Sequence, residues 1–290
     1  MIEFIDTHVH FIDQKDPNLR FSWLEPEFVH PRLGDIDDMK HLTWKPEGLK
    51  AEARFTGLTK VVNVQAALDS EDPVAETAFL QAAADRTGWP NGIVAYVDLA
   101  ADDAAEQLDR HMAYANLRGI RDFGRRPDGD FFADDAWRRG AALLPERSLV
   151  LDIDVQAVDM AKARDAADAL GDVTFILEHA AVPMERTDGF FEIWSDALDL
   201  LAGAPNTYIK VSGLGMGDPE WTVDSLRPWV HRCFDAFGIE RCLFGTNWPV
   251  DRLYSGYRDV VEAYASITAD LTEAERRRFF VGTAEELYRI

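Results

Sequence analysis

Short apolar runs alternate with amphipathic segments along the whole chain, and this alternation constrains the fold more than any other feature. The runs are short, and several are rich in β-branched residues, as strands buried on both faces of a parallel sheet are. The eight runs are Ile2–Ile5, Lys60–Val64, Gly92–Val97, Leu117–Ile120, Leu149–Ile153, Val173–Leu177, Thr207–Val211 and Cys242–Phe244. Eight strands separated by helices in a chain of 290 residues predict an α/β fold, the (β/α)₈ TIM barrel.

The segments between these runs have the spacing of amphipathic helices. In Ser225–Phe237, for example, one helical stripe is apolar and consists of Leu226, Trp229, Val230, Cys233 and Phe237. The predicted helices are Val74–Arg86, Ala104–Tyr114, Asp134–Leu143, Val158–Leu170, Gly189–Leu201, Val223–Phe237 and Tyr257–Ile267. The stretch Leu271–Ile290 adds one or two short helices after the last barrel helix.

One connection departs from this regular pattern. Phe11–Leu58 follows the first run and is rich in Pro, Trp and charged residues. Loops at the carboxyl ends of barrel strands form the active-site mouth, and a long loop there is usually functional. The Pro and Gly positions elsewhere fit loops and not an interdomain linker. We therefore expect a single domain over residues 1–290, with a long functional loop after its first strand.

The formal net charge of −22, from 30 Lys+Arg and 52 Asp+Glu, excludes some classes of partner. Nucleic acids and anionic lipids bind basic faces that release counterions. We therefore expect a small-molecule substrate and neither nucleic acid nor membrane, and a homo-oligomer is compatible with the sequence. Met1–His10 has no basic segment and no long apolar one, and Cys233 and Cys242 form no CxxC motif, so a cytoplasmic protein is expected.

The first run leads into Asp6-Thr-His8-Val-His10, at the expected mouth of the barrel. Alternate residues of a strand share one face, so Asp6, His8 and His10 are expected to point into the barrel. Two imidazoles placed in this way can converge on one metal ion or on one substrate oxygen. A lone histidine is more often structural, but a pair at this spacing is unusual for packing and favours a site.

Two later strand ends carry further polar side chains. His179 follows the sixth run, where the alternative is a histidine satisfied by a backbone carbonyl group. Asn247 lies between Phe244 and Trp248 after the eighth run, where polar groups are costly to bury without partners. The alternative for Asn247 is a hydrogen-bonded turn residue. Asp251 lies four residues further on.

Cationic side chains at strand ends are conspicuous in so acidic a chain. Gln65, Arg121 and Lys210 lie at the ends of the second, fourth and seventh runs. Arg121 with Arg125 could clamp a carboxylate, and Lys210 suits an anionic or carbonyl-bearing ligand. Equally, Arg121 and Lys210 could pair with barrel acids such as Asp152 and stabilise the interior.

Motifs of two other enzyme classes are missing. No GxGxxG loop follows a predicted strand, and Gly213-Leu-Gly215-Met-Gly217 has the wrong spacing and no phosphate-loop lysine. No GxSxG nucleophile elbow occurs. The sequence therefore supports neither dinucleotide redox chemistry nor serine-hydrolase chemistry.

Taken in order, the strand-end motifs resemble those of the amidohydrolase superfamily. They are Asp6-Thr-His8-Val-His10, Gly119-Ile-Arg121, Leu177-Glu178-His179, Lys210-Val-Ser212-Gly213 and Phe244-Gly-Thr-Asn247-Trp-Pro249. The chain looks most like the amidohydrolase-related group of predicted TIM-barrel hydrolases, which includes sugar lactonases and 2-pyrone-4,6-dicarboxylate lactonase. The resemblance covers nearly the whole chain. It implies a (β/α)₈ barrel that hydrolyses a cyclic ester by attack of water on the carbonyl group.

One residue departs from the family pattern, because Asn247 stands where the family usually has Asp. That Asp serves as general base and, in zinc-binding members, as a metal ligand. An amide can orient water but cannot take its proton at neutral pH. Either Asp251 takes over as base, or His8, His10 and His179 hold a divalent metal ion such as zinc that activates the water. Some members of the family work without metal, so the cofactor is one such ion or none.

The resulting hypothesis is a lactone hydrolase acting on a small, carboxylated or polyhydroxylated cyclic ester. His8, His10 and His179 would polarise the carbonyl group, Asn247 would position the water and Asp251 would be the base. The residues expected to hold the substrate are Gln65, Arg121, Arg125, Lys210 and, from the long loop, Trp23. The alternatives are a metal-dependent decarboxylase of the same superfamily and a binding protein that has lost turnover.

Overall fold

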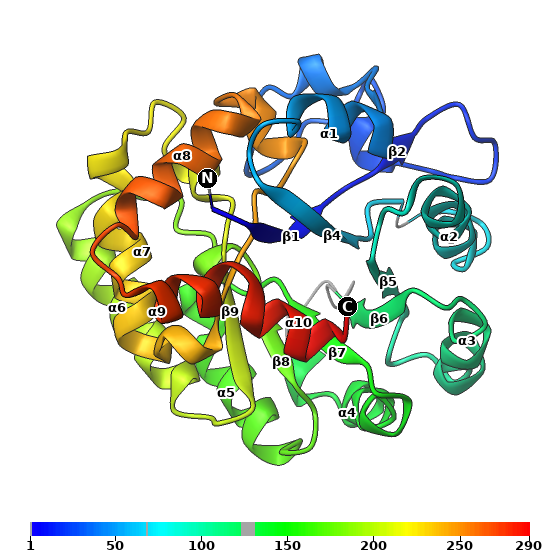
Figure 1. Cartoon of the computed structure of the whole chain (residues 1–290). Coiled ribbons are helices and arrows are strands. Elements are labelled where there is room, and N and C mark those ends of the chain that lie inside the picture. The colour runs from blue at the N-terminus through cyan, green and yellow to red at the C-terminus, as the bar shows by residue number, and fades with distance from the viewer. Residues whose placement is uncertain (1, 68, 123–130) are drawn as a thin grey trace.

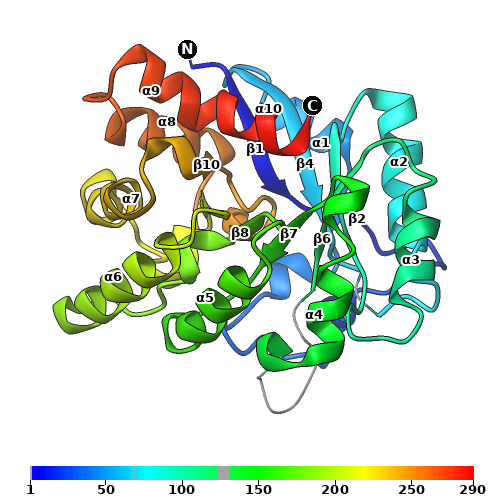
Figure 2. The same ribbon diagram turned by 90° about the horizontal axis from the view of Figure 1, so that it is seen from below.

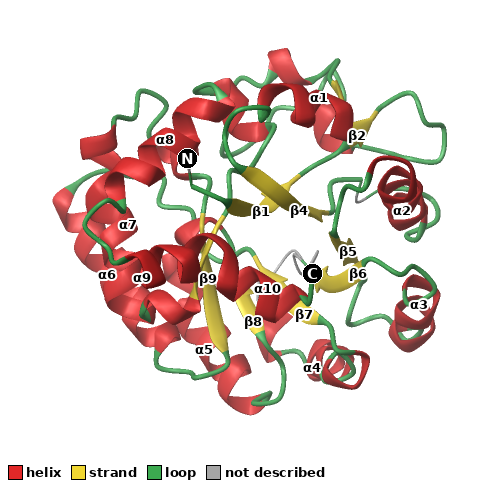
Figure 3. Cartoon of the chain, in the orientation of Figure 1, coloured by secondary structure: helices red, strands yellow, loops and turns green. Residues whose placement is uncertain are grey.

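The computed structural model describes residues 2–67, 69–122 and 131–290, and its centre is a sheet of eight parallel strands. Each strand pairs with its neighbour in chain order, and helices surround the ring (Figures 1 and 3). The strands are β1 (Phe4–Val9), β4 (Leu58–Val64), β5 (Gly92–Tyr96), β6 (Leu117–Arg121), β7 (Val150–Ile153), β8 (Phe175–Leu177), β9 (Thr207–Val211) and β10 (Cys242–Phe244). The predicted (β/α)₈ barrel is confirmed.

Side chains of β1 close the ring against the segment that contains β10. The hydroxyl group of Thr7 donates a hydrogen bond to the Phe244 carbonyl oxygen, over 2.7 Å. The Asp6 carboxylate accepts hydrogen bonds from the Thr246 hydroxyl group, over 2.6 Å, and from the Tyr257 hydroxyl group, over 3.0 Å. Asp6 is fully buried, and burial raises its pKa to about 6. This aspartate therefore secures the closure of the barrel and does not point to its mouth.

Strand β1 is longer than the apolar run Ile2–Ile5 indicated. It continues to Val9, and all six of its residues are buried. Pairing with β4 extends to the contact of Val9 with Asn63, so the ladder runs past the polar residues. His8 therefore lies inside the strand, and His10 follows it.

The helices lie where the apolar stripes indicated, with ends shifted by at most three residues. They are α2 (Ala75–Thr87), α3 (Ala104–His111), α4 (Asp135–Ala141), α5 (Met160–Ala169), α6 (Asp188–Ala202), α7 (Val223–Phe237) and α8 (Tyr257–Ile267). Helix α7 has the predicted ends because Thr222 and Ser225 form a capping box at its start and its apolar stripe is buried. Of the described helices, none is both long and apolar enough to cross a membrane.

The C-terminal segment closes one end of the barrel. Helices α9 (Glu273–Arg277) and α10 (Thr283–Tyr288) cross that end (Figures 1 and 2). The Tyr288 hydroxyl group reaches Asp152 in the barrel interior, over 3.4 Å, and Lys60 donates to the carbonyl oxygen of Ile290, over 2.8 Å. Lys60 lies near the start of β4, so the segment covers the amino ends of the strands and leaves the carboxyl ends for a site.

The long connection after β1 is more regular than expected. It contains a two-stranded antiparallel sheet of β2 (Ile12–Asp13) and β3 (Thr43–Trp44), followed by helix α1 (Pro46–Glu52). The connection is as long as expected, and part of it is helical. Pro46 is favourable in the first turn of a helix, and Leu49 is fully buried. Gly48 lets the Trp44 ring approach, since a Cβ there would lie 3.2 Å from the ring.

Candidate active site

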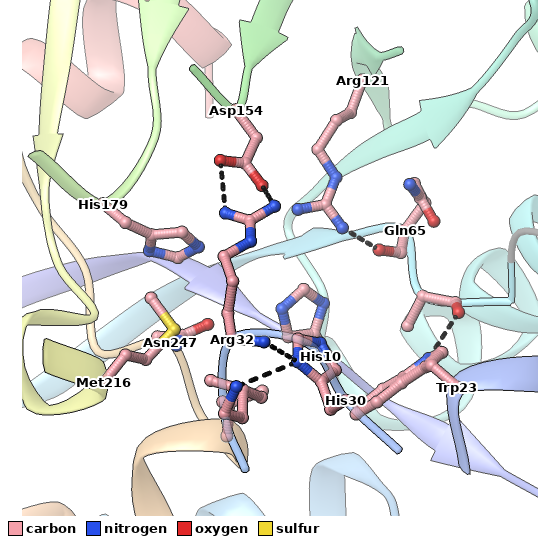
Figure 4. A pocket seen from close by; sticks show the side chains of 13 residues that line it. His10, Trp23, His30, Arg32, Gln65, Arg121, Asp154, His179, Met216 and Asn247 are labelled. Atoms are coloured by element: carbon pink, nitrogen blue, oxygen red, sulfur yellow. Dashed lines mark hydrogen bonds and ion pairs between the residues drawn. The ribbon is translucent and has the colours of Figure 1, made fainter. Parts of the chain in front are cut away.

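A cavity of about 230 Å³ opens among the carboxyl ends of the strands and the long loop (Figure 4). Its lining residues are His10, Trp23, His30, Arg32, Leu33, Gln65, Ala66, Arg121, Asp154, His179, Met216, Asn247 and Val250. Six of these were expected at the site, namely His10, Trp23, Gln65, Arg121, His179 and Asn247. The fold thus brings together side chains from both ends of the chain.

Three buried histidines form a cluster at the base of the cavity. The imidazole rings of His8 and His179 have centroids 4.2 Å apart, and His8 Nε2 lies 3.2 Å from His10 Nε2. Burial lowers the pKa of His10 and of His179 to about 3, and lowers the pKa of His8 well below its ordinary value. The three imidazoles are therefore neutral at neutral pH, which is the form that binds metal ions.

The proton positions in this cluster create a conflict. His10 Nδ1 lies 2.8 Å from the Val64 carbonyl oxygen, which can only accept, so this nitrogen carries the proton and His10 Nε2 is a lone pair. His8 Nε2 faces that lone pair, while His8 Nδ1 lies 3.6 Å from Glu178 Oε1. A neutral imidazole has one N–H proton, so His8 can donate in only one of these two contacts. In the other contact, two acceptor atoms face each other without a proton between them.

A divalent cation beside His8 and His10 would relieve that conflict. His8 could then donate from Nδ1 to Glu178, while both Nε2 lone pairs face the cation. Within the described parts of the chain, His8 Nδ1 and Glu178 Oε1 have no hydrogen-bond partner, which is costly for buried atoms. Donor atoms of His8, Glu178 and His179 also lie within 4.8 Å of one another. The residues present therefore fit a metal ion.

The backbone around His179 is unusual. His179, Ala180, Ala181 and Val182 all have φ between 48° and 62°, a region that residues other than glycine seldom adopt. The indole of Trp194 donates to the Ala180 carbonyl oxygen, over 2.7 Å, and holds this segment in place. Such strain in a well-packed segment is typical of functional sites.

Two neighbours fix the ring of His179. Its Nδ1 lies 3.0 Å from the Ser212 hydroxyl group. Gly213 packs against the ring, and a Cβ at this glycine would lie 2.7 Å from His179 Nδ1. The motif Lys210-Val-Ser212-Gly213 therefore serves the site through Ser212 and Gly213.

Arg121 and Gln65 form one wall of the cavity. The guanidinium group of Arg121 donates to Glu178 Oε2, over 2.8 Å, and to the Gln65 backbone carbonyl oxygen, over 2.6 Å. The Gln65 side chain is 1% exposed, and neither atom of its amide has a hydrogen-bond partner among the described residues. Glu76 accepts from the Ala66 backbone N–H, over 2.8 Å, and holds the loop in place. Gln65 therefore lines the cavity with an amide whose donor and acceptor atoms have no partner among the described residues.

Two further cationic residues, Lys210 and Arg125, were expected to hold the substrate. Lys210 lies inside β9, fully buried, and its ammonium group is ion-paired with Asp152. It is not among the described residues that line the cavity. The interior pairing weighed for Lys210 in the sequence is the arrangement found. Arg125 lies outside the described residues.

Asn247 lines the cavity, but Asp251 does not. Asn247 has a left-handed backbone, with φ of 60°, and its Nδ2 donates to Asp251 Oδ1 over 2.9 Å. The Asp251 carboxylate also accepts from the Gly215 backbone, and burial raises its pKa to about 7. Asp251 therefore lies behind Asn247 and turns the amide so that its carbonyl oxygen is left for the cavity. This position differs from the expected one, in which Asp251 itself reaches the mouth.

Three polar residues of the cavity are not among the site residues expected from the sequence. Arg32 and His30 come from the long loop, and Asp154 follows β7. Both terminal nitrogens of Arg32 donate to the Asp154 carboxylate, over 3.0 Å and 2.8 Å (Figure 4). The only available signal was for Asp154, which directly follows the fifth apolar run and lies two residues after Asp152. Nothing in the sequence indicates where the long loop crosses the mouth.

Comparisons with known proteins match the whole chain. A family model described as Amidohydrolase matches residues 5–290. An uncharacterized protein of Sinorhizobium fredii, y4mH, is 35% identical, and the match covers 100% of this chain and 99% of that protein. An L-fucono-1,5-lactonase of Burkholderia multivorans is 30% identical, over 98% of this chain and 95% of its own length. The crystal structure of a B. multivorans amidohydrolase with bound zinc has a TM-score of 0.85 and 25% identity, over 100% of both chains.

Proposed function

Since this chain belongs to the amidohydrolase family and is a lactonase-like hydrolase, we propose that it opens a small, uncharged lactone by attack of water on the ring carbonyl. The observation that carries the proposal is the convergence of neutral His8, His10 and His179 beside Asn247, at the base of a cavity of about 230 Å³. That volume suits a single small ring.

The reaction adds water to the carbonyl carbon and breaks the ring C–O bond, and one proton of the water ends on the released alkoxide oxygen. His8, His10 and His179, with Glu178 behind His8, would hold a divalent ion, which would supply Lewis-acid polarisation of the carbonyl. Asn247 would accept a hydrogen bond from the attacking water through its carbonyl oxygen and so orient it.

The charges around the cavity favour an uncharged substrate over a carboxylated one. Arg121 is paired with Glu178, and Arg32 is paired with Asp154. Both guanidinium groups already have a carboxylate partner that neutralises their charge, which weakens their attraction for a ligand carboxylate. The L-fucono-1,5-lactonase name of a relative agrees with a sugar-derived ring.

A lactone panel tests this proposal. The purified protein, analysed for metal content, is expected to release acid from gluconolactone faster than from the carboxylated glucarolactone, as followed with a pH indicator. Release of CO₂ from an aromatic acid without lactone opening would instead identify a decarboxylase. Failure to open any lactone, with metal present, would contradict the proposal and favour a binding protein.

Asp251 is expected to act through Asn247, which a pair of substitutions can expose. The carboxylate of Asp251 accepts hydrogen bonds from Asn247 Nδ2 and from the Gly215 backbone. In D251N, the amide that replaces it has only one acceptor atom. We expect the Asn247 amide to turn over and kcat to fall about 10- to 100-fold. The swapped variant N247D/D251N restores every partner, so it should recover activity. It should also gain an acid limb in its pH–rate profile, because position 247 then ionises.

The control is D259N, whose carboxylate accepts from Gly256 at the start of α8. It should keep the parent rate and profile. Equal activity of D251N and the parent, or a swapped variant no better than D251N, would show that Asp251 does not set the orientation of the amide.

A further inference from the structure

The ion pair of Arg32 with Asp154 joins two elements that are far apart in the sequence. Arg32 belongs to the long loop after β1, and Asp154 follows β7, 122 residues away. The contact is bidentate, and the side chain of Asp154 is 9% exposed. Figure 4 shows the pair lying across the cavity between His179 and Arg121. Within the described parts of the chain, Asp154 is the only carboxylate that lines the cavity.

Asp154 keeps its charge in this position. Burial alone would raise its pKa, but the ion pair with Arg32 outweighs burial and holds the pKa of Asp154 below its ordinary value. A carboxylate offers about four acceptor positions, of which the two N–H groups of Arg32 occupy two. The remaining lone pairs can accept hydrogen bonds from a ligand in the cavity.

Two neighbouring groups complete a pattern of donors and acceptors. His30 Nδ1 accepts from the backbone N–H groups of Arg32 and Leu33, over 3.2 Å and 3.1 Å, so its proton lies on Nε2. His30 is therefore a donor at the cavity, and the Gln65 amide, with no described partner, both donates and accepts. A ligand hydroxyl group can both donate and accept hydrogen bonds, and so can match Asp154, His30 and the Gln65 amide together. A ligand carboxylate can only accept, and the CH₂ groups of an unsubstituted ring can neither donate nor accept.

We infer that the Arg32–Asp154 pair determines specificity, with Asp154 accepting hydrogen bonds from hydroxyl groups of a polyhydroxylated ring while Arg32 holds it in place. This inference rests on the proposed lactone hydrolysis and adds the residue by which the site selects its substrate. The pair also anchors the long loop at the mouth, so recognition and loop position depend on one contact.

The test compares two lactones on matched variants. Gluconolactone carries hydroxyl groups and δ-valerolactone does not. In D154N, kcat/KM for gluconolactone should fall about 10- to 100-fold, because a charged acceptor is lost, whereas kcat/KM for δ-valerolactone should change less than about threefold. The R32Q variant should also lower the ratio of kcat/KM for gluconolactone to kcat/KM for δ-valerolactone. D168N is the control. The Asp168 carboxylate pairs with Arg164 on α5 over 2.8 Å, and Asp168 is not among the described residues that line the cavity.

A purely structural pair would reduce the rates on both lactones equally, and that result, or an unchanged ratio, would overturn the inference. If the parent opens no lactone, the proposed function fails, and the inference is tested by binding. Anhydroglucitol, a ring polyol without a carbonyl group, should then bind the parent and D168N but not D154N in ligand-observed NMR. Equal binding to all three, or binding to none, would also overturn it.

Discussion

Replacing His179 with Ala or Asn is expected to reduce lactone opening by at least about 10³-fold while the barrel stays folded. The ring of His179 lies beside His8 and lines the cavity, so its loss removes one of the groups that, in the proposed function, would polarise the carbonyl group of the substrate. The backbone there is left-handed, with φ of 52°. Asn tolerates this conformation better than Ala, so H179N separates a chemical loss from a folding loss.

Three measurements on H179N belong together: kcat from acid release, thermal unfolding, and metal content. We expect near-parental unfolding, a lost rate and reduced metal. H231N is a matched control, because His231 lies on α7, where its ring contacts the Ile267 carbonyl oxygen over 3.1 Å. Full activity in H179N would remove His179 from the mechanism.

The largest effect on stability is expected from replacing Lys210. Its ammonium group forms an ion pair with Asp152 inside the barrel, and both side chains are fully buried. K210M leaves the Asp152 carboxylate buried without its cation, which should lower the free energy of unfolding by about 3–5 kcal/mol. The double variant D152N/K210M removes both charges and should recover most of that loss. Urea unfolding of the parent, both single variants and the double variant measures the coupling.

The loss should also depend on pH. Burial raises the pKa of Asp152 to about 6 in the folded protein, so the folded state binds a proton more tightly than the unfolded chain does. Stability from this group is therefore lost as pH rises through about 4 to 6. Without Lys210 the folded-state pKa rises further, so K210M should lose more at about pH 8 than at about pH 5. A pH-independent loss, or no recovery in the double variant, would show that the two charges are not coupled.

Apart from Trp23 of the long loop, the residues expected at the cavity and found there are those whose position follows from the barrel itself. His10, His179 and Asn247 each follow a strand, and the carboxyl ends of all strands meet at one mouth. For Lys210 the sequence left two readings open, a substrate contact or an ion pair with a barrel acid such as Asp152. Lys210 lies one residue before the end of β9 and pairs with Asp152 of β7, 58 residues away, and only the folded barrel decides between the two readings.

Two other residues of the long loop could not be assigned to the cavity from the sequence, for a different reason. Arg32 and His30 reach the cavity only because the long loop folds back across the mouth, and the contact that fixes it lies 122 residues further on. Asn247 and Asp251 were both expected at the mouth, but only Asn247 lines the cavity. Asp251 lies behind it and accepts a hydrogen bond from its amide, next to a left-handed turn that the sequence does not indicate. Both outcomes depend on tertiary contacts rather than on local pattern.

The carboxylate of Asp154 has a consequence for the end of the catalytic cycle. Opening an uncharged lactone creates a hydroxy acid that ionises at once, so the product gains a negative charge that the substrate lacked. It would form in a cavity whose cations are already paired, beside an ionised aspartate and inside a protein with a net charge of −22. Repulsion from Asp154 and from the net charge would then oppose the attraction of the product carboxylate to the proposed divalent ion and favour release of the product.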